Sequence, residues 1–558
     1  MRTTLGVGLA LCAAAVAGCG SLGTKPPFTG PEKGGAPWTE VSTEHFTLRT
    51  DLPADEARSA ASSFETFFAS LADVGFASES RPKLHLNVVY FRREEAYQAL
   101  EGKNTGAMFD RAGLHDFERT PLVILQGNLV QRTKAVIQHE LTHLFVYYNY
   151  PQAPLWLNEG LAGFYETLDV NDGTATVGRL SDAQHFWRGP WKWQRNPQGV
   201  TTLIPVTEAS PAAQLLDMAP AAFYADRDVN REVEEGRVEL RRVATNYAGV
   251  AALVRMFVTD PAYVEDFSAY LQRLHAGEKS GPAWAATVGG RGVAQIDADY
   301  RASLVTRETS VLKTKYTPPA VTVDAPRTMT NAQVHVLWAA LQNWTTDDGL
   351  ARAARDLEQA RALDAAEPNL AVVRASFAMR ARNPIEASAV LTEALAARPN
   401  DPRLLNAMGW ATFSRLVDES PQLTSDRVLP ALQPIADRLA PIASTSAELD
   451  LLAHYAAFKP SADALAYEKR AIDVNPSCSS CLAWAAQVYA MKGQFHDAID
   501  TATMAIQLLP DGARAPGLEK AIAAYRDHIA KSVAKARTTV TAPSAPTDTA
   551  ADAPPATP

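Results

Sequence analysis

The sequence predicts an α+β domain followed by an all-α array of helical repeats. Three observations predict this arrangement. Short strand patterns alternate with helix patterns up to about residue 315, a Pro-rich segment follows, and the remainder is Ala-rich, almost entirely helical and repetitive. A chain of 558 residues also exceeds the length of about 250 to 300 residues at which single hydrophobic cores stop growing, so more than one domain is expected.

The charge balance argues against a nucleic-acid partner. The chain has a formal net charge of -9 at pH 7 and a hydrophobic fraction of 47%, which is typical of a globular protein. Nucleic-acid binding depends on a basic patch, and no run of Lys and Arg in the sequence supplies one. We therefore expect no nucleic-acid binding.

The first 18 residues have the pattern of an export signal. Arg2 supplies the positive start, and residues 5–16 form an apolar core too short to span a bilayer. The next segment, VAGC, ends at Cys19 and resembles the lipobox of bacterial lipoproteins; an ordinary signal peptide is the alternative. The resemblance implies a lipid anchor at Cys19 that holds the protein to the bacterial cell envelope on the periplasmic face, and Gly20 in place of Asp implies the outer membrane.

The first folded elements follow a tether. Residues 19–37 are rich in Gly and Pro and poor in apolar residues, which predicts a flexible segment. Segments 46–50, 84–91 and 121–125 are predicted strands, and 54–74 has the spacing of a helix. The third strand could bind an extended substrate at a sheet edge, or it could be an ordinary sheet strand.

Two helices are predicted after the third strand. Residues 129–148 lie between a good N-cap and a proline stop, and a second helix, 154–166, begins at a proline. Small residues beside Glu159 would let the second helix approach the first closely. Further on, 172–178 is a predicted hairpin and 245–257 a predicted buried helix.

The first of these helices carries the motif HELTH. His139 and His143 are four residues apart, so both rings lie on one helix face and can bind one ion, with Glu140 beside them. Zinc in hydrolases usually has three protein ligands and one water, and Glu159 on the second helix offers the third ligand. The alternative is a buried helix pair that carries polar residues without binding a metal.

HELTH followed by LWLNEGLAGFYE resembles the gluzincin peptidases, both the aminopeptidase N-like enzymes and the bacterial peptidase MA-like domains. The resemblance implies a zincin-like metallopeptidase domain over residues 38–315. It also implies His139, His143 and Glu159 as ligands of a Zn2+ cofactor and Glu140 as the general base. Glu166 then becomes a residue that supports the ligands.

Other features of the sequence bear on the same resemblance. Tyr247 is the best match to the residue that stabilises the oxyanion in gluzincins, although a core tyrosine is the alternative. Segment GAMFD has Phe109 where the aminopeptidase N-like enzymes have the glutamate that holds the free amine of the substrate. The aromatic run 185–193 could line a cleft or pack a loop onto the domain.

Residues 316–330 are a predicted Pro-rich linker, and 331–535 a predicted helical array with the 34-residue period of tetratricopeptide repeats. Four residues recur with that shift: Tyr455, Ala464, Ala471 and Pro476 match Tyr489, Ala498, Ala505 and Pro510. Gly493 stands at the turn of the repeat, and the segment 413–449 does not fit the period cleanly. The pair Cys478 and Cys481 could form a disulfide or remain thiols.

These expectations combine into one predicted function. The protein is a lipid-anchored zinc peptidase of the cell envelope that cuts a peptide or protein substrate, and its repeats bind clients or partners. The alternative is a non-catalytic envelope scaffold that acts through the repeats. The last segment, 536–558, cannot form a core and is predicted to be disordered.

Overall fold

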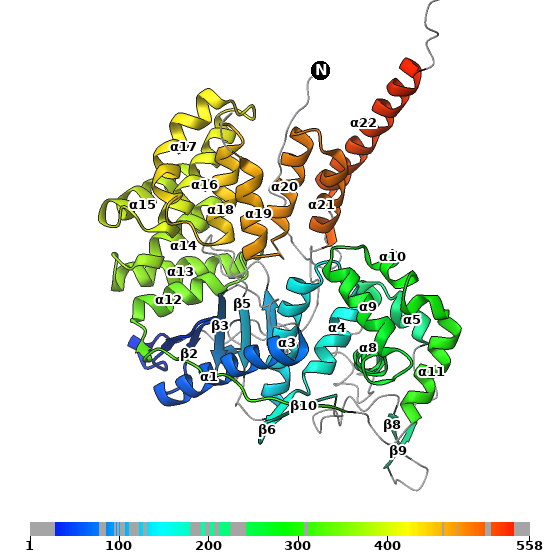
Figure 1. Cartoon of the computed structure of the whole chain (residues 1–558). Helices are drawn as coiled ribbons and strands as arrows, with labels where there is room; N and C mark the ends of the chain where they lie inside the picture. The colour runs from blue at the N-terminus through cyan, green and yellow to red at the C-terminus, as the bar shows by residue number, and fades with distance from the viewer. Residues whose placement is uncertain are drawn as a thin grey trace, which may run out of the picture.

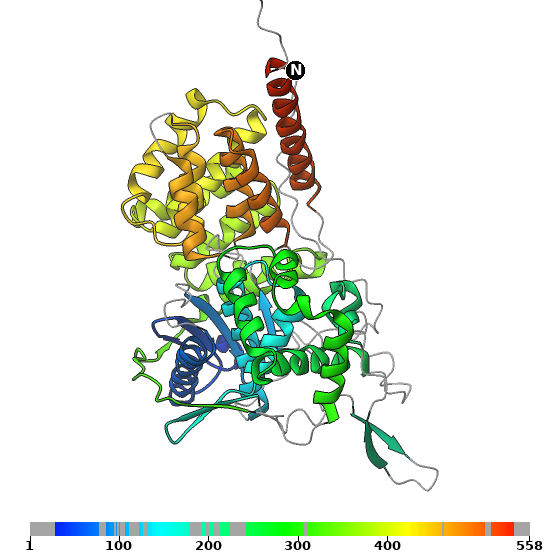
Figure 2. The ribbon, with the colours of Figure 1, turned by 45° about the vertical axis from the view of Figure 1, so that its right-hand side comes forward.

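The chain forms an α+β domain with a stack of helices on one side of it (Figure 1, Figure 2), so the predicted order of an α+β part and an all-α repeat part is confirmed. The computed structural model describes residues 28–76, 85–93, 96–97, 100, 107–110, 122–126, 131–178, 191–195, 201–205, 211–223, 241–305, 311–459, 463–476, 478–507 and 515–540. The predicted signal, Cys19 and the tail beyond residue 540 lie outside these ranges.

A six-stranded sheet forms the centre of the α+β domain. Its strands, in spatial order, are β11 (Arg327–Thr328), β1 (Thr39–Ser42), β2 (Phe46–Thr50), β3 (Leu86–Phe91), β5 (Leu122–Gln126) and β4 (Ala107–Asp110). Strands β2, β3 and β5 are parallel, and β4 is antiparallel to β5. Because β5 pairs on both sides, it is not an edge strand, and of the two alternatives for segment 121–125 the ordinary sheet strand holds.

Both faces of this sheet are covered. All six residues of β3 are buried, as expected of a strand with helices on either side. Leu86, Val88 and Tyr90 join the core formed with α1 (Ala54–Ser70) and α3 (Gln131–Asn149). Val89 and Phe91 join a second core on the opposite face.

The helix that covers this opposite face is α12 (Asn331–Leu341), the first helix of the predicted repeat region. Its Trp338 ring lies 5.7 Å from Phe91 and 6.4 Å from Trp38, measured between centroids. The predicted linker 316–330 also holds β11, which pairs with β1. The boundary drawn at residue 315 therefore cuts through a shared core, because contacts between residues about 250 positions apart leave no local sequence pattern.

The second part of the predicted tether is also attached to α12. Phe28 stacks on Trp338 at 4.0 Å between ring centroids, and Glu32 accepts a hydrogen bond from His335 Nε2 at 3.1 Å. The expectation of a flexible tether up to residue 37 is therefore wrong for residues 28–37. One aromatic ring and one carboxylate are enough to fix this Gly- and Pro-rich segment.

His335 gives the stability of the chain a pH dependence. Burial lowers the pKa of His335, but the hydrogen bonds and charges of Asp356 and Glu32 outweigh burial, and its pKa lies above the ordinary 6.5. A raised pKa stabilises the fold fully below about 6.5 and loses this effect as the pH rises through the folded-state pKa. We expect the urea midpoint of His335→Gln to fall less than that of the parent between pH 6.5 and 9. His496→Gln, at an exposed position, is the control, and parallel curves for the parent and His335→Gln would contradict the assignment.

The remaining elements of the α+β domain surround the sheet. The hairpin predicted at 172–178 is present and turns at Asp172 and Gly173, both with positive φ. In chain order the elements are η1 (Pro31–Lys33), η2 (Leu71–Gly75), α4 (Leu155–Tyr165), β6 (Asp169–Asn171), β7 (Thr174–Val177), β8 (Trp191–Arg195), β9 (Thr201–Pro205), α5 (Ala212–Leu216), α6 (Pro220–Phe223), α8 (Arg241–Thr259), α9 (Val264–His275), α10 (Ser280–Ala285), η5 (Val288–Arg291), α11 (Val293–Val305) and β10 (Leu312–Lys315). Of the aromatic run 185–193, only 191–193 is described, in β8.

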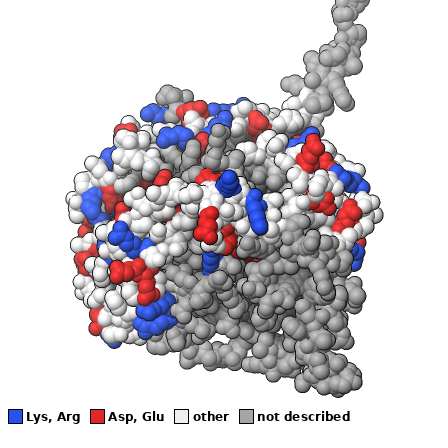
Figure 3. All heavy atoms as spheres, turned by 60° about the horizontal axis from the view of Figure 1, so that its bottom comes forward, with Lys and Arg blue, Asp and Glu red and all other residues white. Residues whose placement is uncertain are grey.

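Charged side chains of both signs lie interspersed on the underside of the α+β domain. Figure 3 shows Lys and Arg next to Asp and Glu across the described part of this face. Ion pairs at the surface of the α+β domain include Arg291 with Asp266 and Arg301 with Asp297. Exposed pairs of this kind contribute little to stability.

The array consists of consecutive helix pairs followed by a long last helix. After α12 come α13 (Asp347–Leu363), α14 (Pro368–Arg380), α15 (Pro384–Ala397), α16 (Pro402–Glu419), α17 (Ser425–Leu439), α18 (Ser446–Ala456), α19 (Ala464–Val474), α20 (Ser479–Met491), α21 (Phe495–Gln507) and α22 (Pro516–Val540). Ala464 and Ala471 on α19 and Ala498 and Ala505 on α21, related by the 34-residue shift, are all buried. The repeat is therefore real in the structure.

The array departs from its period where the sequence suggested it. Helix α16 has 18 residues, and α17 contains Pro430 and Pro434 inside the helix. Each internal proline removes a backbone hydrogen bond and tends to kink a helix. Helix α22 runs five residues past the predicted start of the disordered tail at residue 536. None of the helices in the described part of the chain is long and apolar enough to cross a membrane.

The turn between α20 and α21 depends on a glycine. Gly493 has φ +76, which costs a residue with a side chain about 1 kcal/mol, although a Cβ would meet no atom within 4 Å. We expect Gly493→Ala to lower the free energy of unfolding by about 1 kcal/mol in urea denaturation. Gly517→Ala on α22 adds the same methyl group in open space without a positive φ and should instead stabilise by about 0.5 kcal/mol. Equal effects of the two changes would show that the left-handed turn does not matter.

Candidate metal centre

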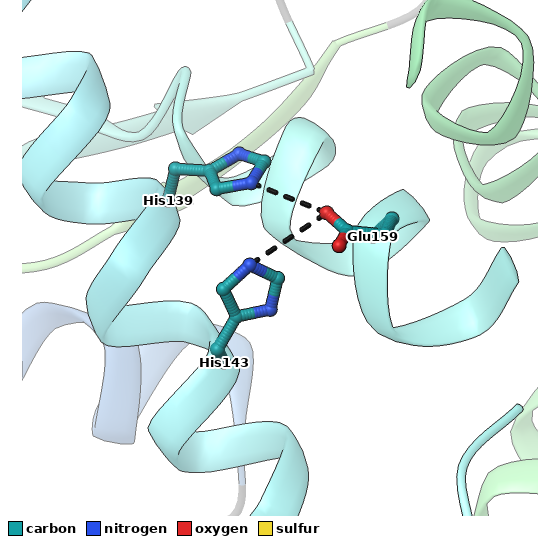
Figure 4. A group of neighbouring side chains, drawn as sticks. All are labelled: His139, His143 and Glu159. Carbon is teal, nitrogen blue, oxygen red and sulfur yellow. Dashed lines mark ion pairs between the residues drawn. The ribbon is translucent and has the colours of Figure 1, made fainter. Parts of the chain in front are cut away.

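Helices α3 and α4 bring three possible metal ligands together. His139 and His143 lie four residues apart on α3, and Glu159 lies on α4; Figure 4 shows both rings directed toward the Glu159 carboxylate. His139 Nε2 is 3.4 Å and His143 Nε2 is 3.6 Å from Glu159 Oε2. The three ligand atoms all lie within 4.8 Å of one another, so one ion can contact all of them.

Glu159 is held in place by the packing of α4. From Trp156 to Tyr165 every residue of this helix is buried. A Cβ on Gly160 would meet Val254 at 2.6 Å, and one on Gly163 would meet Ala251 at 2.9 Å. Both of these neighbours belong to α8. The sequence analysis expected the small residues of α4 to allow a close approach to α3, but these two glycines allow a close approach to α8.

Hydrogen bonds fix both imidazoles from behind. His139 Nδ1 lies 3.0 Å from Glu166 Oε2, and His143 Nδ1 lies 3.0 Å from Asn158 Oδ1. Because carboxylate and amide oxygens accept, each Nδ1 carries the hydrogen, and Nε2 is the ring nitrogen that faces Glu159. Metal-binding histidines almost always have such a partner, which sets the tautomer and the ring orientation. Glu166 therefore contacts His139 through Nδ1, the ring nitrogen that does not face Glu159.

The site is electrostatically prepared for a cation. Burial lowers the pKa of His139, but hydrogen bonds to Glu159 and Glu166 and the charges of both carboxylates outweigh burial and raise its pKa well above the ordinary value. The negative charges of Glu159 and Glu166 thus favour a positive charge beside the two imidazole rings. Two imidazole nitrogens and one carboxylate oxygen are a donor set that Zn2+ accepts, which leaves a fourth position for water.

The structure describes both predicted reacting side chains. Glu140 is half-buried on α3, directly after His139. Tyr247 on α8 is half-buried, with its ring 6.0 Å from the His139 ring and 5.0 Å from the Phe223 ring, measured between centroids. The structure thus brings Tyr247 to the site from about 100 residues further along the chain.

Sequence reasoning did not single out Asn158 or Tyr147. Asn158 donates from Nδ2 to the Tyr147 hydroxyl at 2.9 Å and contacts His143 at the same time. Two sequence signals could have identified them. Tyr147 follows His143 by four residues and so shares its helix face, and Asn158 is a poor helix former that stands next to Glu159 in a buried helix of otherwise mostly apolar residues.

A second group of possible ligands lies in the array. Asp450, His454 and Glu468 also have ligand atoms within 4.8 Å of one another. His454 Nδ1, however, hydrogen-bonds the Asp450 carbonyl oxygen on its own helix at 2.9 Å, and its ring stacks on Trp484 at 3.9 Å between centroids. This is the environment of a histidine packed between repeats.

The two cysteines of the CSSC segment form a disulfide, so of the two alternatives for Cys478 and Cys481 the structure has the bonded pair. The bond lies where α20 begins. Cys481, inside the first turn of α20, is fully buried, and Cys478 is the residue that caps this helix.

Comparisons with known proteins concern a minor part of the chain. No protein-family model matches it, and no curated protein matches it. The crystal structure of MamA is similar over 29% of this chain and 91% of its own length, with 16% identity and a TM-score of 0.22. The crystal structure of YrrB, described as a TPR protein with an unusual peptide-binding site, is similar over 32% of this chain and 88% of its own, with 19% identity and a TM-score of 0.22.

Proposed function

We propose that this protein is a zinc-dependent peptidase whose helical array holds protein or peptide clients. The observation that carries the proposal is the convergence of His139, His143 and Glu159, with the Nδ1 atom of each histidine already hydrogen-bonded. A chance cluster of polar side chains would not be expected to hold both rings in the same tautomer toward one point.

The reacting groups would divide the work as follows. His139, His143 and Glu159 would hold a zinc ion, which would supply a polarised water with a lowered pKa. Glu140 would accept a proton from the attacking water and donate it to the departing amine nitrogen of the peptide. Tyr247, whose ring lies 6.0 Å from the His139 ring between centroids, would donate a hydrogen bond from its hydroxyl to the developing negative charge on the carbonyl oxygen. Glu166 and Asn158 keep the two imidazoles oriented throughout.

The array would provide the selectivity that the metal site lacks. Stacked helix pairs form extended surfaces that bind segments of other proteins, and this array takes up residues 331–540. We also propose that a lipid on Cys19 attaches the chain to the outer membrane of a bacterial cell, on its periplasmic face. The attachment would keep the site close to clients in the cell envelope.

A second candidate is a non-catalytic scaffold that acts only through the repeats. The extent of the array favours this function, because a separate binding surface of this size needs no catalysis to be useful. The two candidates differ in one measurable property: a scaffold has no need of the metal.

The test uses the chain from residue 20 onward, which keeps the contacts of Phe28 and Glu32 with α12. We expect about one zinc per chain by elemental analysis, as a single site requires, and zinc-dependent cleavage of an unfolded protein such as casein. His143→Ala should remove both, whereas His496→Ala, at an exposed position on α21, should remove neither. A parent protein that takes up no zinc even after loading would leave the scaffold as the function.

A further inference from the structure

A chain of contacts links the metal centre to the repeat array. It begins at His143 Nδ1, which hydrogen-bonds Asn158 Oδ1 at 3.0 Å, and continues from Asn158 Nδ2 to the Tyr147 hydroxyl at 2.9 Å. Asn158 is buried and Tyr147 half-buried. The amide of Asn158 can therefore turn only if it gives up one of two hydrogen bonds in a place with little water.

Tyr147 is the last residue in this series of contacts, and its ring lies against the array. It packs on the cluster around Leu482 of α20 and Ala505 of α21. Partly buried side chains from the neighbouring helices complete the same cluster: Ile472, Ala483, Met504 and Leu518. The position of the tyrosine is thus set from one side by α3 and from the other by the last repeats.

The array is attached to the α+β domain at other points close by. Val474, at the end of α19, packs against the core of the α+β domain. Lys279 Nζ at the start of α10 lies 2.9 Å from Asp500 Oδ1 on α21. Together with the packing of Tyr147, these contacts show that α19, α20 and α21 all meet the α+β domain.

We infer that Tyr147 is a positioning residue for His143 and that helices α20 and α21 complete the support of the metal centre. The inference rests on the proposed zinc site. Partners behind a metal-binding histidine orient the ring, and their loss typically costs 10- to 100-fold in metal affinity. The Tyr147 hydroxyl acts on His143 through Asn158. We therefore expect an effect at about the lower end of that range. A client that displaces α20 or α21 therefore changes how tightly the metal is held.

Tyr147→Phe tests the hydroxyl alone. We expect zinc affinity, measured by competition with a chromophoric chelator, to fall about 10-fold. The visible absorption bands of the Co2+-substituted protein should shift, because they report the geometry of the ligands. Tyr148→Phe is the matched control, because it removes a hydroxyl from the next residue of α3. Tyr148 is also half-buried, and burial and the negative charge of Asp473 on the array raise its pKa. It should leave affinity and spectrum unchanged.

A second variant tests the same series of contacts by a change in the array. Leu482→Ala removes packing beneath Tyr147 without altering α3, and we expect weaker zinc binding and a Co2+ spectrum shifted as in Tyr147→Phe. Leu391→Ala removes an equally buried leucine from α15, in another cluster of the array, and should leave the zinc site unchanged. Thermal melts of all variants record general destabilisation separately.

The outcomes separate the inference from the proposed function. If Tyr147→Phe binds zinc as tightly as the parent with an identical Co2+ spectrum, the positioning role is wrong and the zinc site stands. If Leu482→Ala and Leu391→Ala weaken zinc binding equally, the array acts only through overall stability and the support by α20 and α21 is wrong. A parent protein that binds no zinc overturns the proposed function and the inference with it.

Discussion

Glu140→Gln is expected to abolish casein cleavage while the protein still binds about one zinc per chain. The amide has the size and shape of the carboxylate but cannot accept a proton at neutral pH. General bases contribute on the order of 10²- to 10⁴-fold to the rate, so the residual activity should fall below the detection limit of an ordinary casein assay. The three proposed ligands His139, His143 and Glu159 are untouched, which is why metal content should not change.

The control for this experiment is Glu393→Gln, at an exposed position on α15. It removes the same charge from the array and should cleave casein at the parental rate. If Glu140→Gln retained full cleavage, another group would have to accept the proton, and the assignment of Glu140 would fall. If Glu140→Gln lost its zinc, the loss of activity would report on metal binding and not on proton transfer.

The sequence predicts the local elements of this fold well because each depends on its own residues. Strand β2 has the predicted bounds 46–50, and helix α4 begins after the proline that was expected to start it. The clustering of the candidate ligands was equally accessible, since two histidines at helical spacing share a face whatever the rest of the chain does. The approach of Glu159 to both rings required only that two consecutive helices pack side by side.

The features that the sequence did not predict depend on contacts between distant residues. Trp338 reads as one apolar residue of an Ala-rich helix, and only the sheet shows that it fills the core beside Phe91. Phe28 lies in a segment whose composition predicts a tether, yet stacking on Trp338 fixes it. The packing of Tyr147 likewise involves Leu482, more than 300 residues away. A pattern with a period of two or of 3.6 residues carries no information about such partners.

The shared core predicts that the α+β domain cannot fold when the chain ends at residue 315. Such a chain lacks β11 and α12, and it uncovers apolar side chains on one face of the sheet. These are Trp38, Val89, Phe91, Leu122 and Ile124. Burial of each large apolar side chain stabilises by about 1.5 to 3 kcal/mol, so the loss is on the order of 10 kcal/mol. That is comparable to the whole stability of a typical domain.

We therefore expect residues 20–315 to accumulate as aggregate and residues 20–398 to remain soluble and to melt cooperatively. The longer chain keeps α12, α13 and α14, which supply Trp338, Leu357 and Leu370 to the core beneath the sheet. Solubility after expression and the shape of the thermal melt decide between the two chains. Cooperative melting of residues 20–315 would mean that α12 belongs to the array alone. Aggregation of the shorter chain would show that the first helix of the array is also a structural part of the α+β domain, because that helix covers one face of its sheet.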